Sequence, residues 1–369
     1  MDTPQNLPDV ALFCDKKGRV VAPPVLPQGA RIADTHTHLD MLTDPALALA
    51  RCAVYGVDYM VTVIDPAENA TTVFAQLPTW MSDAQALLDD WGVAGAVELP
   101  TVHAAIGVHP QHAELFQSAI QSIKEVGSRI GFEPGAPARA SAEQRALEHT
   151  RSHPRTQTNT ATHFPNDASD RGETVPPIVC LGEIGLDYHY EGMSDVDPDY
   201  EPSAPREVQK DVFRKQIKLA KQYDMPIALH VRDAHEDALS ILKAEGLPKR
   251  GALLHCVTVN WDTLKPFIEL GCMAAFGGAL TFNRSDDICD AARHVPKDRL
   301  LTETDAPFMA PVPLRGIPCE PAQTIFTAAC LAQQFGCAND VAFYDRLYDN
   351  AVGFFDIPAI DIKTVSSIM

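Results

Sequence analysis

Two histidines near the N-terminus, His36 and His38, stand two residues apart in the run Asp34-Thr-His-Thr-His-Leu-Asp40. The short apolar run before them predicts a strand, and side chains at positions i and i+2 of a strand project to the same side. Neutral imidazole is the most common protein ligand for divalent transition metals. The pair could therefore hold one metal ion, although two histidines alone could equally serve packing.

Residues of the types that bind metals or anions recur after other apolar runs of the chain. Each of the following comes at the end of such a run: His109, Glu183, Asp187, His230, Arg232, His255 and Asp305. Charged groups are rarely buried without a partner or a metal ion. Because such residues follow several different apolar runs, a metal site is a better explanation than packing.

Eight short apolar runs predict eight strands, and near-continuous apolarity is typical of strands buried on both faces of a parallel sheet. The predicted strands are Ile32–Thr35, Tyr59–Ile64, Ala104–Val108, Ile178–Gly182, Ile227–His230, Ala252–His255, Met273–Phe276 and Leu300–Glu303. Helical patterns stand between them, including Ala46–Tyr55, Ala113–Val126, Glu207–Tyr223, Ala234–Glu245, Trp261–Leu270 and Asp286–His294. This alternation predicts an α/β fold, a single (β/α)8 TIM barrel, with a doubly wound open sheet as the alternative. The carboxyl ends of barrel strands meet at one mouth, where active sites of this architecture lie.

Other parts of the chain depart from this alternation of strands and helices. We expect residues 1–28 to form an extended arm, 29–357 the barrel and 358–369 a C-terminal tail. An insertion at 131–177, before the fourth strand, is expected on the face opposite the mouth. An acidic loop at 191–202 follows the fourth strand. It lacks a glycine where an EF-hand needs one, which favours a solvated loop over a calcium site.

The composition is that of an ordinary globular chain, with 369 residues, 46% hydrophobic and 21% charged. No apolar run approaches the ~20 residues that span a bilayer, and the N-terminal residues lack the features of a signal peptide. The chain has nine cysteines and no Cys-x-x-Cys pair, which argues against a disulfide framework and a structural zinc site. We therefore expect a cytoplasmic protein with no membrane association.

The net charge of −19 limits the possible partners. A chain this acidic is not expected to coat nucleic acid through a broad basic face. Long-range electrostatics would also oppose the approach of a polyanion. Any polyanionic substrate must therefore be held locally, by metal ions or by a few arginines.

The donor types predict a two-metal hydrolase. Four histidines and two carboxylates are enough for two divalent ions if one carboxylate bridges them. Mixed nitrogen and oxygen donors suit Zn²⁺, Mn²⁺ or Mg²⁺ and do not select among them. Two ions about 3.5–4 Å apart would activate a shared water and clamp the leaving oxygen of a phosphoryl or carbonyl centre.

From about Arg31 to Phe355 the chain resembles the TatD family of metal-dependent hydrolases, usually described as deoxyribonucleases. The motifs that carry the resemblance are Asp34-Thr-His-Thr-His-Leu-Asp40, Gly107-Val-His-Pro110, Gly182-Glu-Ile-Gly-Leu-Asp-Tyr188, His230-Val-Arg232, Leu254-His-Cys256 and Glu303-Thr-Asp-Ala-Pro307.

The resemblance also implies roles for the ligands. It implies one metal on His36, His38 and Asp305, a second on His230 and His255, and Glu183 as the bridge. Asp305 and Glu183 would be the catalytic carboxylates, with Asp305 orienting the attacking water and accepting its proton.

Further residues are candidates for contacts with substrate or with the ligands. Arg232 and Arg315 could bind phosphate, because a guanidinium matches phosphate geometry, although surface ion pairs are the alternative. His109 could touch substrate or satisfy a loop backbone. Asp187 and His189 could orient the metal-binding imidazoles.

Two departures from the family pattern bear on the substrate rather than on hydrolysis. The chain reads His255-Cys-Val-Thr-Val259 where the family usually has an aromatic residue after the cysteine. It also has Cys319 where the family usually has an asparagine. Neither departure removes a metal ligand.

The expected function is that of a divalent-metal-dependent deoxyribonuclease, a 3′–5′ exonuclease acting on DNA ends. The alternative is an ester or amide hydrolase such as a D-aminoacyl-tRNA deacylase, because the same activated water could attack a carbonyl. A non-catalytic scaffold would be favoured by the loss of a ligand, and none is lost. No obligate protein partner is evident from the sequence.

Overall fold

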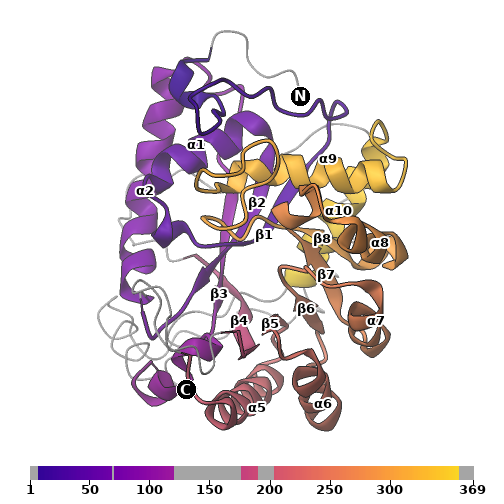
Figure 1. Ribbon diagram of the computed structural model, residues 1–369. Coiled ribbons are helices and arrows are strands. Elements are labelled where there is room, and N and C mark those ends of the chain that lie inside the picture. Colours follow the sequence, from indigo (N-terminus) through magenta and orange to yellow (C-terminus); the bar gives the residue numbers. More distant parts are fainter. Residues whose placement is uncertain (1–6, 69, 120–175, 190–202, 357–369) are drawn as a thin grey trace, which may run out of the picture.

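The computed structural model describes residues 7–68, 70–119, 176–189 and 203–356. Their core is one eight-stranded parallel sheet in which the strands follow one another in chain order (Figure 1). The strands are β1 Ile32–Thr37, β2 Val57–Ile64, β3 Thr101–Ile106, β4 Ile178–Asp187, β5 Ile227–Arg232, β6 Ala252–Leu254, β7 Met273–Phe276 and β8 Leu300–Thr302. The predicted (β/α)8 barrel is confirmed.

The sheet closes where β1 meets the end of β8. Thr302 Oγ1 donates a hydrogen bond to the carbonyl oxygen of Ala33 at 2.9 Å. Nearer the carboxyl end of β1, the backbone N–H of Asp305 donates to the carbonyl oxygen of His36, also at 2.9 Å. The residues after β8 are thereby held against the end of β1.

Side chains along the strands alternate between two apolar layers, as a pleated sheet requires. One layer packs between the strands and the surrounding helices and includes Ile32, Met60 and Leu254. The other layer includes Ala33, Val61 and Leu253, the neighbours of those residues in sequence. Because both faces are covered, the strands read as nearly continuous apolar runs.

Three predicted strands end later than expected, and this correction affects the site. β1 was predicted to end at Thr35 but continues to Thr37, so His36 lies within the strand. β4 was predicted to end at Gly182 and β5 at His230, but they continue to Asp187 and Arg232. Their extensions pair with each other, Gly185 beside His230 and Asp187 beside Arg232. Glu183, Asp187 and Arg232 therefore project from strands, whose backbone is firmly held, and not from loops.

Most predicted helices are present with nearly the expected bounds. They are α1 Pro45–Tyr55, α5 Arg206–Gln222, α6 His235–Glu245, α7 Trp261–Leu270 and α8 Asp286–His294. α1 has clear end signals, since the Asp44 side chain accepts a hydrogen bond from the N–H of Leu47 and Gly56 adopts the left-handed conformation. The structure adds α2 Ala70–Asp90, α9 Thr324–Gln334 and α10 Val341–Phe355, which were not predicted from the sequence.

The helix expected at 113–126 differs in its first part, which is a 3-10 turn, η3 Pro110–Leu115. Pro110 follows directly on His109, where the chain leaves the mouth of the barrel. The expected helix lies outside the described residues from 120 onward, as do the insertion at 131–177 up to 175, the acidic loop at 191–202 and the tail at 358–369.

The N-terminal segment lies along α1 (Figure 1). The ring of Phe13 stacks on Tyr55 with centroids 4.3 Å apart. Arg51 donates to the carbonyl oxygen of Val10 and to both carboxylate oxygens of Glu320, at 2.5 and 2.6 Å. The segment is thus fixed to the barrel, and the same arginine holds the chain ahead of α9. Among the described helices, none has the length and apolarity needed to cross a membrane.

Candidate metal centre

The six predicted ligands meet at the carboxyl end of the barrel. Five of them line a single cavity of about 450 Å³, and they are His38, Glu183, His230, His255 and Asp305. His36 is fully buried behind this wall. Side chains separated by up to 269 positions in the sequence are thereby brought together.

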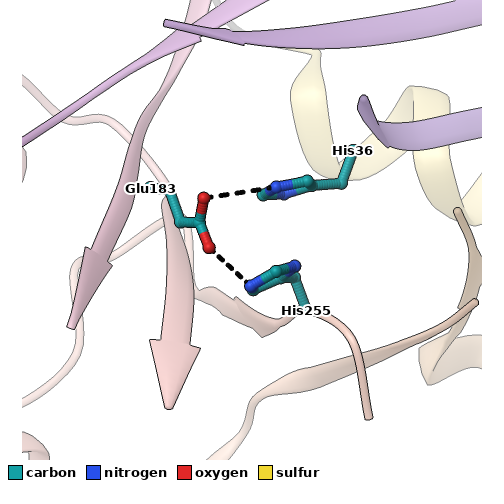
Figure 2. A group of neighbouring side chains, drawn as sticks. All are labelled: His36, Glu183 and His255. Atoms are coloured by element: carbon teal, nitrogen blue, oxygen red, sulfur yellow. Dashed lines mark ion pairs between the residues drawn. The ribbon is translucent and has the colours of Figure 1, made fainter. Parts of the chain in front are cut away.

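Glu183 lies at the centre of the group and uses its two oxygens differently. Oε2 lies 3.4 Å from His36 Nε2 and 3.9 Å from His38 Nε2. Oε1 lies 2.5 Å from His230 Nδ1 and 2.6 Å from His255 Nε2. Figure 2 shows the carboxylate between the rings of His36 and His255, with one oxygen turned toward each. This is the arrangement expected of a carboxylate shared by two cations.

Asp305 completes the group from the opposite side. Its Oδ1 lies 3.7 Å from His36 Nε2 and 3.5 Å from His38 Nε2. Its backbone has φ +58°, a left-handed conformation that aspartate tolerates better than most residues. A strained conformation at a cluster of functional side chains is typical of a site whose geometry is imposed by the surrounding fold.

The donor atoms form three overlapping sets in which all atoms lie within 4.8 Å of one another. They are His36, His38 and Asp305; His36, Glu183 and His255; and His109, Glu183 and His230. Within the described part of the chain, neither ring nitrogen of His36 has a hydrogen-bond partner, and His255 Nδ1 also has none. Buried polar atoms are almost always satisfied, so these nitrogens and the carboxylates around them fit divalent cations.

The site concentrates negative charge that imidazoles balance. Burial works against ionisation of Glu183, but its electrostatic interactions with the imidazoles of His255, His36 and His230 outweigh it and hold its pKa well below the usual range. The pKa of Asp305 is likewise lowered, because its hydrogen bond with His38 and nearby imidazoles exceed the cost of burial. Both carboxylates are therefore ionised near neutral pH.

The pKa values of the histidines shift in opposite directions. Burial lowers the pKa of His36 to about 4, so this imidazole is neutral and ready to act as a ligand. Burial also opposes the charge on His38 and His230, but contacts with carboxylates outweigh it. Asp305 and Glu183 raise the pKa of His38 to about 9. Glu183 and Asp187 raise that of His230 to about 10.

Two further carboxylates lie close to ring nitrogens of the candidate ligands. Asp187 Oδ2 lies 3.1 Å from His230 Nε2, which confirms the predicted contact with an imidazole. Glu303 Oε1 lies 3.8 Å from His255 Nδ1 and accepts the backbone N–H of Cys256 at 2.5 Å. Such carboxylate–histidine pairs fix the ring orientation and raise the basicity of a metal ligand. His189 instead contacts Asp233, at 2.7 Å.

The candidate substrate residues divide into two groups. His109 and Arg232 line the cavity, and His109 Nε2 lies 3.8 Å from Glu183 Oε1. Arg315 is exposed and lies over the ring of Phe282, 3.8 Å from its centroid, and it is not among the residues that line the cavity.

Part of the cavity wall was not predicted from the sequence. Asp65, Glu68 and His112 line the cavity on the side of β2 and β3. A usable signal existed for one of them, because Asp65 directly follows the apolar strand β2 just as Glu183 follows the apolar start of β4. Glu68 stands in a loop and His112 in the 3-10 turn η3, and the positions of both depend on tertiary structure.

Comparisons with known proteins agree with this geometry. A family model described as "TatD related DNase" matches residues 33–356. The uncharacterized metal-dependent hydrolase TatD of Mycobacterium tuberculosis is 28% identical over 82% of this chain and 89% of its own length. The uncharacterized metal-dependent hydrolases YabD of Bacillus subtilis and YcfH of Escherichia coli are 38% and 35% identical. Those matches cover only 57% and 66% of the respective relatives, and 42% and 51% of this chain.

A solved structure shares the fold over most of the chain. The TatD homologue YJJV of E. coli superposes with a TM-score of 0.61 at 25% identity, covering 89% of this chain and 99% of its own. The family model spans the barrel from β1 to the end of α10, including every candidate ligand. The chain therefore belongs to the TatD family of metal-dependent hydrolases.

Proposed function

We propose that the protein is a deoxyribonuclease that hydrolyses phosphodiester bonds at DNA ends with two divalent cations. His36, His38 and Asp305 would hold one cation and His230 and His255 the other. The division of Glu183 between two sets of imidazoles is the observation that carries this proposal. Mg²⁺, Mn²⁺ and Zn²⁺ all suit these donors.

The bound cations would supply Lewis acidity toward a non-bridging phosphate oxygen. The protein supplies the proton acceptor, Asp305, whose lowered pKa keeps it ionised and able to orient the attacking water. Arg232 lines the cavity and would bind the phosphate through its guanidinium. His109 would contact the substrate from the β3 side.

The shape of the site supports action on a chain end. A cavity of about 450 Å³ has the size of a small-molecule pocket, not of a channel through which a duplex passes. The net charge of −19 disfavours extended contacts with a nucleic acid backbone. A terminal nucleotide entering the cavity satisfies both constraints, and the family description points to DNA as the polymer.

Hydrolysis of single-stranded DNA labelled at either end tests the proposal. After addition of Mg²⁺ or Mn²⁺, we expect mononucleotides to be released from the 3′ end, and the His230→Ala variant to lose this activity. Random internal cuts would contradict exonuclease action. Release of an amino acid from charged tRNA without DNA hydrolysis would replace the proposal by the deacylase alternative.

A further inference from the structure

Asp65, Glu68 and His112, here called the β2–β3 cluster, form part of the cavity wall that the proposed mechanism does not use. Asp65 accepts hydrogen bonds from the N–H of Ala67 at 2.8 Å and from the N–H of His109 at 3.1 Å. Its Oδ2 also lies 2.7 Å from His112 Nδ1. The side chains of Asp65 and His112 are both only 11% exposed, so this contact is shielded from water.

These contacts fix where the protons lie. Asp65 already accepts two backbone N–H groups, so its oxygen atoms act as hydrogen-bond acceptors. His112 Nδ1 therefore donates to Asp65, and the other ring nitrogen, Nε2, faces Glu68 Oε1 at 3.3 Å. A lone pair facing a carboxylate would be repulsive. One proton must therefore lie between His112 Nε2 and Glu68 Oε1, whichever atom it is bonded to.

The other groups near Glu68 are consistent with a retained proton. Burial raises the pKa of Glu68. Asp65 and Asp40 act in the same direction, while His112 and His38 act against them. The cluster as a whole carries more carboxylates than imidazoles, which makes it a poor anion site and suits it to hold one proton.

The cluster and the proton acceptor face the cavity from different strands. Asp305 follows β8, whereas Asp65 follows β2 and His112 lies in the turn after β3. The ring of His109 lies near both the cluster and a candidate metal ligand, with its centroid 6.1 Å from that of His112 and 4.4 Å from that of His230. A substrate in this cavity can therefore meet a proton acceptor and a proton donor on separate walls.

We propose that His112, oriented by Asp65 and paired with Glu68, donates the proton that the leaving oxygen takes up as the ester bond breaks. This inference rests on the proposed function. The attacking water forms the new P–O bond and gives one proton to Asp305. The P–O bond to the leaving group breaks, its electron pair stays on the leaving oxygen, and that oxygen takes the proton from Nε2. Asp305 later loses its proton to solvent, and the His112–Glu68 pair regains one.

The test compares two leaving groups. A nucleoside alkoxide needs a proton, whereas p-nitrophenolate is stable without one. For His112→Asn, whose amide N–H can still donate to Asp65, we expect kcat on a thymidine dinucleotide to fall roughly 10²–10⁴-fold. On thymidine 5′-p-nitrophenyl phosphate we expect a change below about 3-fold. Glu68→Gln should show the same selectivity, and His294→Asn, at an exposed histidine of α8, should leave both rates unchanged.

The outcomes separate this inference from the proposed function. Equal losses on both substrates would show a structural role for His112, and unchanged rates would show none; either result overturns the inference. Failure of the unmodified protein to hydrolyse either phosphodiester would instead contradict the proposed function. Nitrogen NMR of the His112 imidazole needs no substrate. We expect its pH titration to shift in Glu68→Gln, and an identical titration in the two proteins would refute the shared proton.

Discussion

Glu183 is a buried carboxylate whose two oxygens face two different sets of imidazoles. An ionised carboxylate in this position would be very costly without positive partners. The surrounding histidines provide them in the absence of metal, and cations would provide them more strongly when bound. The same residue therefore joins imidazoles from separate strands and divides the site into two halves.

Asp187 supports His230 from behind, and its removal should weaken metal binding without removing a ligand. We predict that Asp187→Asn lowers the affinity for Mn²⁺ or Zn²⁺ about 10- to 100-fold, the usual effect of losing such a partner. The reason is that His230 would lose the carboxylate that orients its ring at 3.1 Å. Competition with a fluorescent chelator measures the change.

Asp211→Asn is the matched control for that experiment. Asp211 lies on α5 and pairs at 2.7 Å with Lys215, where its side chain is 61% exposed. We expect its substitution to leave metal affinity unchanged. Equal affinities for Asp187→Asn and the unmodified protein would mean that Asp187 does not act through His230.

Metal binding should release protons, because His38 and His230 must lose theirs to become ligands. Carboxylates raise the pKa values of these two residues to about 9 and about 10, against the effect of burial. Both are therefore protonated near neutral pH, and affinity should increase as the pH rises toward those values. Calorimetry in buffers of different ionisation enthalpy should report roughly two protons released near pH 7 when both cations bind, about one for each cation. A heat independent of the buffer would contradict this.

The sequence indicated the candidate ligands but not all their neighbours. His36, His38 and Asp305 could be predicted because ligand-type residues after apolar runs must meet at one end of a parallel barrel. Arg315 shows the limit, because its partner Phe282 lies 33 positions away and only the folded chain brings the two together. His112 was missed for the same reason, since its partner Asp65 follows a different strand.

At the scale of elements, the close approach of β4 and β5 positions the site. Gly185 on β4 has φ +151°, and a Cβ there would overlap the carbonyl oxygen of His230. We predict that Gly185→Ala lowers the free energy of unfolding by about 1–3 kcal/mol, because the two strands must separate. Metal affinity should fall as well, since His230 would move with β5. Urea unfolding and chelator competition measure the two effects.

Gly353→Ala serves as the control for Gly185→Ala. Gly353 lies within α10, and a Cβ there would have no heavy atom within 4 Å. Alanine should stabilise the helix there by up to roughly 1 kcal/mol, since it has less backbone freedom to lose. A similar loss of stability in both variants would show that the β4–β5 contact is not special.

The elements were predictable to the extent that local pattern determines them. β7 and α7 have the predicted bounds, because an apolar run and clear end signals define them. α2 contains Pro78, which interrupts a helical pattern in sequence although the helix continues through it. α9 is buried along nearly its whole length, so it lacks the amphipathic period that identifies a surface helix.

At the scale of the whole molecule, charge and cavity act in opposite directions on a nucleic acid. The net charge of −19 repels a polyanion at long range, while the cavity would attract a single phosphate once cations are bound. Association with a long substrate should therefore be limited by repulsion between the approaching molecules. The chemical step, deep in the cavity, should be largely shielded from it.

Salt should consequently accelerate the hydrolysis of DNA, the reverse of what is typical for proteins that bind DNA through basic surfaces. Raising monovalent salt from roughly 20 to 150 mM shortens the screening length to about 8 Å and weakens the repulsion. At fixed metal concentration we predict that kcat/KM for a 30-nucleotide strand rises about 2- to 10-fold through faster association. The value for thymidine 5′-p-nitrophenyl phosphate, which carries a single charge, should change little. A steep fall with salt on the long strand would instead reveal a basic binding surface, and the charge argument would be wrong.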